Sequence, residues 1–231
     1  MRRVFKAGAA AKLMFAAIGQ ESSAADRSLT FFSGVEAEHR TVFATAGGKI
    51  SLRPGPEFGS FVLLSTGVSL SDLSRARRGE IAQGGVNTEA RLFAGVERSA
   101  GMAYGNAAVG PSLVQYIDRT GRERRRAGVA LHADLWLRPD ETQLFTATVI
   151  ADSAQPSLWT RLRYGWRTGL LPGYLGIEAS ASLSSTTRKI RLGVMLAEWR
   201  IGPVTAAFSA GWMRDRRLSG PYGAMTAYIN F

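Results

Sequence analysis

The side chains in this sequence that could perform chemistry are charged residues spaced two positions apart. His132 stands two residues before Asp134, and Arg161 stands two residues before Arg163. A histidine beside a carboxylate can act as a general base, and paired arginines can bind anionic groups. A spacing of two brings side chains to one face only on an extended strand. The chemistry of these residues therefore depends on β-strands that hold them side by side.

Metal binding and glycoside hydrolysis find little support in the sequence. The chain has no cysteine, and its two histidines, His39 and His132, lie far apart in the sequence and do not form a set of metal ligands with several close carboxylates, so we expect no metal site and no cofactor. Hydrolysis of a sugar bond requires two carboxylates that flank the bond. The candidate carboxylates are spread over three separate stretches of the chain (88–98, 127–138 and 174–183), which favours internal ion pairs with arginines: Glu89, Glu97, Asp134 and Glu178.

Alternating apolar and polar residues run through most of the chain after residue 28. In residues 158–167, Leu162 and Tyr164 oppose Arg161 and Arg163. A period of two residues is the signature of a β-strand. The pattern predicts twelve strands, at 29–38, 41–51, 60–70, 88–98, 102–116, 127–138, 142–152, 158–167, 174–183, 189–199, 204–213 and 222–231.

Three features favour a single antiparallel transmembrane β-barrel over a soluble β-sandwich, which also alternates. Full charges lie in mid-strand on the polar faces, where a polar lumen can hydrate and pair them. Aromatic residues, among them Tyr164, Trp166 and Trp212, lie near the ends of the apolar faces, as in the interfacial girdles of membrane barrels. The connections alternate in length, and the two longest, 71–87 and 117–126, fall on the same side. The sequence therefore predicts an all-β membrane protein.

Both ends of the chain fit such a barrel. Residues 1–25 have a positive start, an apolar core and small residues at the end, which predicts a secretory signal peptide. The last alternating run, 222–231, ends on an aromatic residue, as the closing strand of an outer-membrane barrel does. We expect this run to pair with 29–38. Residues 26–231 would then form one barrel with both termini in the periplasm.

The polar faces predict what lines the lumen. Arginines there favour anionic solutes, whereas aromatic rings suit neutral sugars, and both could instead fill a narrow lumen by pairing with carboxylates. Twelve strands lie between the filled eight-stranded barrels and the open porins, and we expect a filled or narrow lumen. The residues expected to line it and to contact a polysaccharide or an anion are Arg91, His132, Asp134, Trp136, Trp159, Arg161, Arg163, Lys189 and Arg191.

Two arginine-rich segments, 75–78 and 119–126, contribute to a formal net charge of +11. They lack the interleaved aromatic residues that stack on bases, and no nucleic-acid-binding signature accompanies them, so we expect no nucleic-acid partner. Behind a secretory signal, such loops would face lipopolysaccharide phosphates or other acidic polymers. Outer-membrane lipid and lipopolysaccharide are therefore the expected surroundings.

Three segments of the mature chain resemble a known family. Residues 29–37 (LTFFSGVEA), 135–139 (LWLRP) and 159–165 (WTRLRYG), in this order and at this overall length, are similar to the cellulose biosynthesis protein BcsS family of Gram-negative bacteria. The resemblance covers nearly all of the mature chain. It implies an outer-membrane barrel that supports the assembly or export of cellulose, with cellulose or other cellulose-synthesis subunits as partners. It supplies no catalytic residues.

Two other functions remain as alternatives. The inward Arg161, Arg163, Lys189 and Arg191 lie on strands separated by one hairpin strand, which would suit a narrow porin for anionic oligosaccharides. An outer-membrane lipid hydrolase is less favoured, because His132 faces the lumen and no Gly-x-Ser-x-Gly segment is present. We therefore expect no catalytic residue.

Overall fold

A computed structural model describes residues 27–39, 41–52, 58–71, 85–118, 120–185, 187–216 and 218–231. The expected signal peptide, residues 1–25, and the arginine-rich segment 75–78 lie outside the described residues. The described ranges contain no helix that is both long and apolar enough to cross a membrane.

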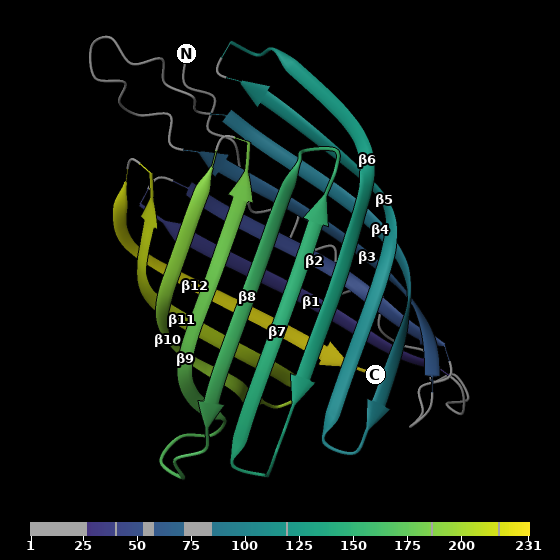
Figure 1. Ribbon diagram of the computed structural model, residues 1–231, viewed down its shortest axis with the longest axis vertical. Coiled ribbons are helices and arrows are strands. Elements are labelled where there is room, and N and C mark those ends of the chain that lie inside the picture. Colours follow the sequence, from purple (N-terminus) through teal and green to yellow (C-terminus); the bar gives the residue numbers. More distant parts are fainter. Residues whose placement is uncertain are drawn as a thin grey trace.

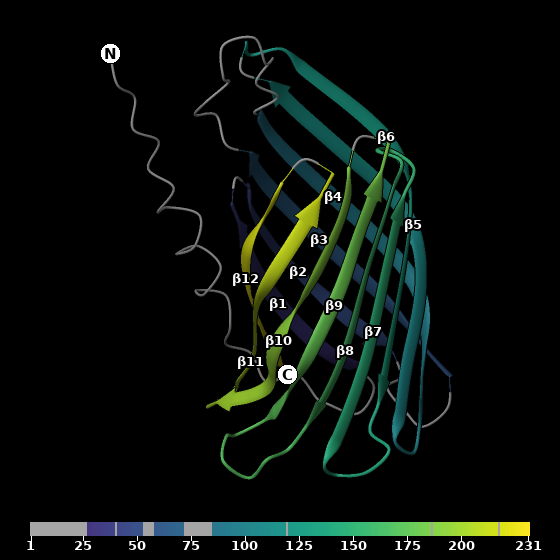
Figure 2. The ribbon, with the colours of Figure 1, turned by 60° about the vertical axis from the view of Figure 1, so that its left-hand side comes forward.

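Twelve antiparallel strands form a closed barrel in which every strand pairs with its neighbours in sequence (Figures 1 and 2). The predicted fold is therefore confirmed. The strands are β1 (Arg27–Glu38), β2 (Thr41–Leu52), β3 (Phe58–Ser71), β4 (Gly85–Ala100), β5 (Ala103–Asp118), β6 (Glu123–Leu137), β7 (Gln143–Asp152), β8 (Ser157–Trp166), β9 (Tyr174–Ser184), β10 (Arg188–Ile201), β11 (Val204–Asp215) and β12 (Ser219–Asn230).

The barrel closes between its first and last strands, as the sequence predicts. Their register runs from Thr30 opposite Asn230 to Glu38 opposite Tyr222. Beyond the Thr30–Asn230 pair, the backbone N–H of Phe231 donates to the carbonyl of Leu29 at 2.8 Å. No edge is left open at this seam, which is what a sheet in hydrocarbon requires. We call the barrel end at which Leu29 and Phe231 lie the terminal rim. The opposite end, at which Glu38 and Tyr222 lie, is the distal rim.

The alternation sorts side chains between the outer surface and the lumen. On the outer surface, apolar side chains such as Leu162 and Ile190 are exposed. The aromatic residues expected in interfacial girdles, Tyr164, Trp166 and Trp212, are also exposed on this surface. An apolar exterior with aromatic belts matches a lipid solvent rather than water.

The lumen contains two hydrophobic clusters as well as charges. One includes Phe61, Leu63 and Phe93, with Phe32 of β1 packed against it. The other includes Leu144, Tyr174, Met195, Ala197 and Ala207, with Trp136 packed against it. Apolar side chains from several strands therefore pack together inside the barrel beside the charges.

One expectation about the loops is wrong. Residues 117–126 were expected to form a long connection, but Ile117 pairs with Glu123 and Gln115 pairs with Arg125, so most of the segment is strand. β6 pairs with β7 only from Ala130 onward. The β5–β6 hairpin therefore extends roughly 24 Å along β6 from Ala130 to Glu123, at about 3.4 Å per residue. It rises past the distal rim (Figures 1 and 2).

Candidate functional site

The most extensive polar cluster of the lumen lies toward the distal rim and crosses the barrel. Glu36 of β1 accepts hydrogen bonds from Arg161 of β8 and from Arg191 of β10, the latter at 2.8 Å. In the strand order, β12, β11, β10 and β9 separate β1 from β8. A contact between β1 and β8 therefore joins nearly opposite walls through the lumen.

Glu178 of β9 holds the centre of this cluster, and its side chain is 1% exposed. It accepts a hydrogen bond from the Nε of Arg163 at 2.6 Å and lies 3.6 Å from the Nε of Arg161. The hydroxyl of Tyr222 on β12 donates to its other oxygen at 3.3 Å. One buried carboxylate thus compensates two arginines, and removing it would leave a buried positive charge without a partner.

Glu38 completes the cluster. It pairs with Lys189 and with Arg191, both from β10. The four predicted cations of β8 and β10 therefore meet three carboxylates, and each cation has at least one ion pair. These cations are paired within the protein, although the Nε atoms of Arg161 and Arg191 have no hydrogen-bond partner among the described residues. An anion-selective pore requires cations that remain available to solute. The three carboxylates and four cations of this distal network are Glu36, Glu38, Glu178, Arg161, Arg163, Lys189 and Arg191.

Arg91 of β4 belongs to a second cluster on the same half of the lumen. Its Nη atoms donate to Glu89 at 2.6 and 2.9 Å, and its Nε donates to Asp152 of β7 at 2.8 Å. Ser112 of β5 donates to the other oxygen of Asp152 at 2.8 Å. This predicted lumen residue is therefore held by two carboxylates.

His132 and Asp134 are adjacent on β6, with 3.3 Å between the histidine Nε2 and a carboxylate oxygen. Asn106 donates to the same carboxylate at 3.2 Å, and the histidine ring packs against Phe93 at 5.6 Å between centroids. Among the described residues, no side chain bonds to the histidine Nδ1. A hydrolytic triad needs a nucleophile within about 3 Å of its base, and the described contacts of His132 include no serine.

Part of the lumen lining was not predicted from the sequence. Lys49 of β2 donates to both Glu97 of β4 and the hydroxyl of Tyr104 of β5, and this hydroxyl donates to Glu97 at 2.6 Å. Lys49 also lies over the rings of Phe61 and Tyr104. The alternation of β2 could have indicated this position, since Lys49 and Ser51 lie on one face.

The two predicted tryptophans differ in their surroundings. Trp159 of β8 has the guanidinium of Arg161 over its ring, 4.6 Å from the centroid. Trp136 of β6 packs against the hydrophobic cluster around Tyr174 and Leu144. Both rings are thus in contact with other side chains of the barrel.

Near the terminal rim, an irregularity in β10 positions another ion pair. The register shifts between Leu196 and Trp199, and Glu198 has a φ of 56°, rare for a residue with a side chain. The bulge turns the Glu198 carboxylate toward Arg138, with which it pairs. In the neighbouring turn, hydrogen bonds from the hydroxyl and N–H of Thr142 lower the pKa of Asp140 below its ordinary value.

Taken together, these contacts place paired charges and clustered apolar side chains on the inner faces of the strands. The described residues hold no cluster of three or more histidine, cysteine, aspartate or glutamate side chains suited to a metal ion. Such an arrangement can stiffen a barrel and fix its shape in the membrane. In the distal network each cation has an ion pair, and the rings of Trp136 and Trp159 contact other side chains.

The comparisons with known proteins agree with this architecture. The family model described as "Cellulose biosynthesis protein BcsS" matches residues 30–231. No curated protein shows significant similarity to the chain.

Among solved structures, the β domain of the Bordetella autotransporter BrkA is 15% identical, with a TM-score of 0.52 over 89% of this chain and 99% of that one. The translocator domain of the autotransporter NalP from Neisseria meningitidis is 12% identical, with a TM-score of 0.49 over 88% of each chain. At such identities the first likeness establishes the fold alone, that of an outer-membrane β-barrel.

Proposed function

Since the chain belongs to the cellulose biosynthesis protein BcsS family, we propose that it is a non-enzymatic outer-membrane barrel that supports the assembly or export of cellulose. Family and fold support a role in cellulose biosynthesis at the outer membrane. The finer proposal is that the barrel acts as a filled scaffold, and that cellulose or other cellulose-synthesis subunits meet its surface. Both termini would lie in the periplasm, after removal of a signal peptide within residues 1–25.

The observation that carries the scaffold proposal is the ion pairing across the lumen. Glu36 joins β1 to both β8 and β10, so the distal part of the lumen is bridged by side chains. Breaking buried ion pairs costs about 3–5 kcal/mol when one partner is removed. A polymer or a solute passing through the barrel would have to displace these bridges.

Deleting the gene in a cellulose-producing host tests the cellulose role. We expect extracellular cellulose to fall, and cellulose retained in the periplasm to rise if the barrel acts in export. The two pools are measured separately by enzymatic digestion and glucose release, with the wild-type gene restored as the control. Unchanged amounts in both pools would show that the barrel does not serve cellulose.

Conductance separates the scaffold from a narrow anion porin. The purified protein in a planar bilayer should show no steady current, since the cations that would select anions are paired. In a porin, replacing Arg161 and Arg163 by glutamine would remove anion selectivity, read as the reversal potential in asymmetric salt, and leave the barrel folded. Anion-selective current in the parent that is lost in the folded double variant would contradict the scaffold proposal.

A further inference from the structure

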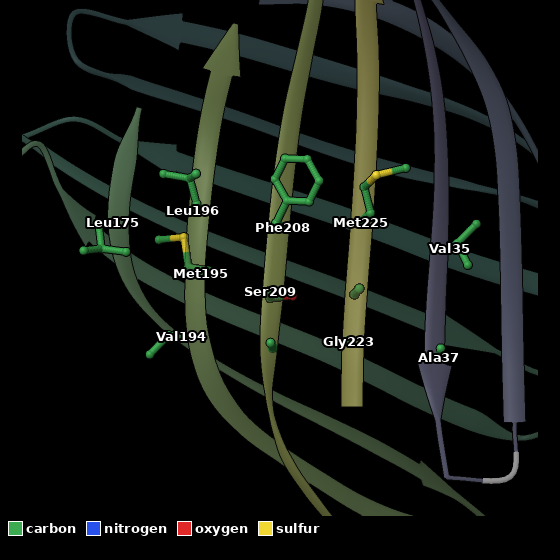
Figure 3. A pocket seen from close by; sticks show the side chains of 12 residues that line it. Val35, Ala37, Leu175, Val194, Met195, Leu196, Phe208, Ser209, Gly223 and Met225 are labelled. Carbon is green, nitrogen blue, oxygen red and sulfur yellow. The ribbon is translucent and has the colours of Figure 1, made fainter. Parts of the chain in front are cut away.

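A shallow apolar hollow lies on the outer surface of the barrel, over β9 to β12 and β1, with a volume of about 680 Å³. Leu196, Phe208 and Met225 form a row across three neighbouring strands (Figure 3). Phe208 is the register partner of Leu196 on one side and of Met225 on the other. The next row toward the distal rim has Ala210 opposite Gly223. This second row is small on three strands, with Ala210, Gly223 and Ala37, and has Val194 at its β10 side. The hollow lies where these small residues follow the row of large ones.

No neighbouring atom among the described residues of the barrel forces residue 223 to be glycine. A Cβ atom added at Gly223 would lie 3.9 Å from its nearest neighbour, the carbonyl oxygen of Ser209, which is ordinary van der Waals contact. At Gly211 on the next strand, the same atom would lie 2.2 Å from a backbone oxygen. Gly223 therefore leaves open space on the outer surface where the barrel itself could accommodate a side chain.

Two arginines lie between this hollow and the distal rim. Arg214 of β11 is the register partner of Ile190, which is exposed on the outer surface, and Arg188 begins β10 two residues before Ile190. Both arginines are exposed. Within the described ranges, neither has an ion pair or a hydrogen bond through its side chain. The carboxylate of Asp215 accepts from the backbone N–H of Arg216 instead.

The spacing between the arginines and the hollow matches the depth of one lipid leaflet. Along β11, Arg214 is four residues from Ala210 and six from Phe208. A rise of about 3.4 Å per residue and a tilt of about 40° place the hollow roughly 10–15 Å below Arg214. The hydrocarbon core of one leaflet is about 15 Å deep. An acyl chain in the hollow would therefore belong to a lipid with its head group beside the arginines.

We propose that this surface binds one lipid A molecule of outer-leaflet lipopolysaccharide, with an acyl chain in the hollow and a phosphate on Arg188 and Arg214. Arginine binds phosphate through paired charge-assisted hydrogen bonds. A second copy of the barrel fits this surface poorly, because a symmetric contact would bring the unpaired arginines of both copies together. The choice of lipid A rests on the proposed orientation, in which the distal rim faces outward.

The charge arm of the test uses the purified, folded full barrel and native mass spectrometry, titrated with bis-phosphorylated lipid A. The Arg188→Gln/Arg214→Gln variant should bind lipid A about thirty-fold more weakly, on the basis of about 1 kcal/mol for each arginine near an anionic lipid surface. Arg98→Gln, which removes an exposed charge near the terminal rim, is the control and should bind as the parent does.

The groove arm fills the hollow with a side chain. Gly223→Leu should weaken lipid A binding about tenfold, equivalent to the loss of roughly two buried methylene groups. Gly105→Leu is the matched control, since a Cβ there meets nothing closer than 3.7 Å and the residue lies on the distant β5. Both variants should retain the heat-modifiable gel mobility of the folded parent.

Three results would overturn the proposal. These are unchanged binding in both the arginine and the Gly223 variants, equally tight binding of phosphatidylglycerol by the parent, and a parent dimer that Gly223→Leu dissociates. The binding measurement is independent of cellulose. If the protein binds lipid A but deletion of its gene leaves cellulose unchanged, only the proposed function is rejected. If deletion lowers extracellular cellulose but the protein does not bind lipid A, only this inference is rejected.

Discussion

Replacing Glu178 by glutamine should destabilise the barrel by about 3–5 kcal/mol, the range found when one partner of a buried ion pair is removed. The substitution keeps the shape of the side chain but leaves Arg163 without its carboxylate and Arg161 with Glu36 alone. Urea unfolding of the reconstituted protein, followed by heat-modifiable gel mobility and tryptophan fluorescence, measures the change.

Two further variants establish whether the effect comes from a buried charge. Glu123→Gln breaks a pair with Arg125 whose side chains are 40% and 75% exposed, and it should cost at most about 1 kcal/mol. Combining Glu178→Gln with Arg163→Gln removes the uncompensated cation and should recover part of the stability. Equal losses in Glu123→Gln and Glu178→Gln would refute the structural role of the distal network.

Replacing Gly176 by valine should destabilise the barrel by about 3 kcal/mol, the upper end for a side chain forced into a packed site. Gly176 of β9 is the register partner of Gly165 on β8. A Cβ atom at Gly176 would lie 2.0 Å from the carbonyl oxygen of Tyr164 and 2.4 Å from the Cα of Gly165. Both obstacles are backbone atoms, so the two strands would have to separate.

The same substitution at Gly105 provides the comparison for this prediction. The nearest atom to a Cβ at Gly105 is the carbonyl oxygen of Asp134 at 3.7 Å, which is ordinary van der Waals contact. Gly105→Val should change stability by less than about 0.5 kcal/mol. If both valine variants unfold at the same urea concentration, close approach of β8 and β9 does not require glycine.

The strands could be predicted from the sequence because the two faces of each strand lie in different environments. Where lipid covers one face and the lumen the other, as along β8 and β10, apolar and polar residues alternate and the period is plain. The end of the β5–β6 hairpin was predicted as a loop for the converse reason. Beyond the distal rim, water reaches both faces of that hairpin, so Arg124, Arg125 and Arg126 continue a strand without any apolar face.

The partners inside the lumen could be predicted only in part. Alternation showed that Arg161 and Arg191 face inward, but it cannot show which wall lies opposite. Closure of the ring brings Glu36 to both of them. Glu36 and Glu38 were missed as lumen residues because the outer face of β1 includes the small residues Ser33 and Ala37, which weaken its apolar signal.

The seam between β1 and β12 has a consequence for the order of folding. Each of the other strand pairs joins neighbours in sequence, whereas the seam joins residues as far apart as Thr30 and Asn230. Forming so distant a contact carries the largest loop-closure entropy in the sheet, although adjacent hairpins shorten the effective loop as they form. Hairpins should therefore assemble first and the ring should shut last. Until the ring closes, β1 and β12 both expose unpaired backbone groups that could pair with strands of other chains. We therefore expect β1 to need protection from intermolecular pairing until β12 has folded.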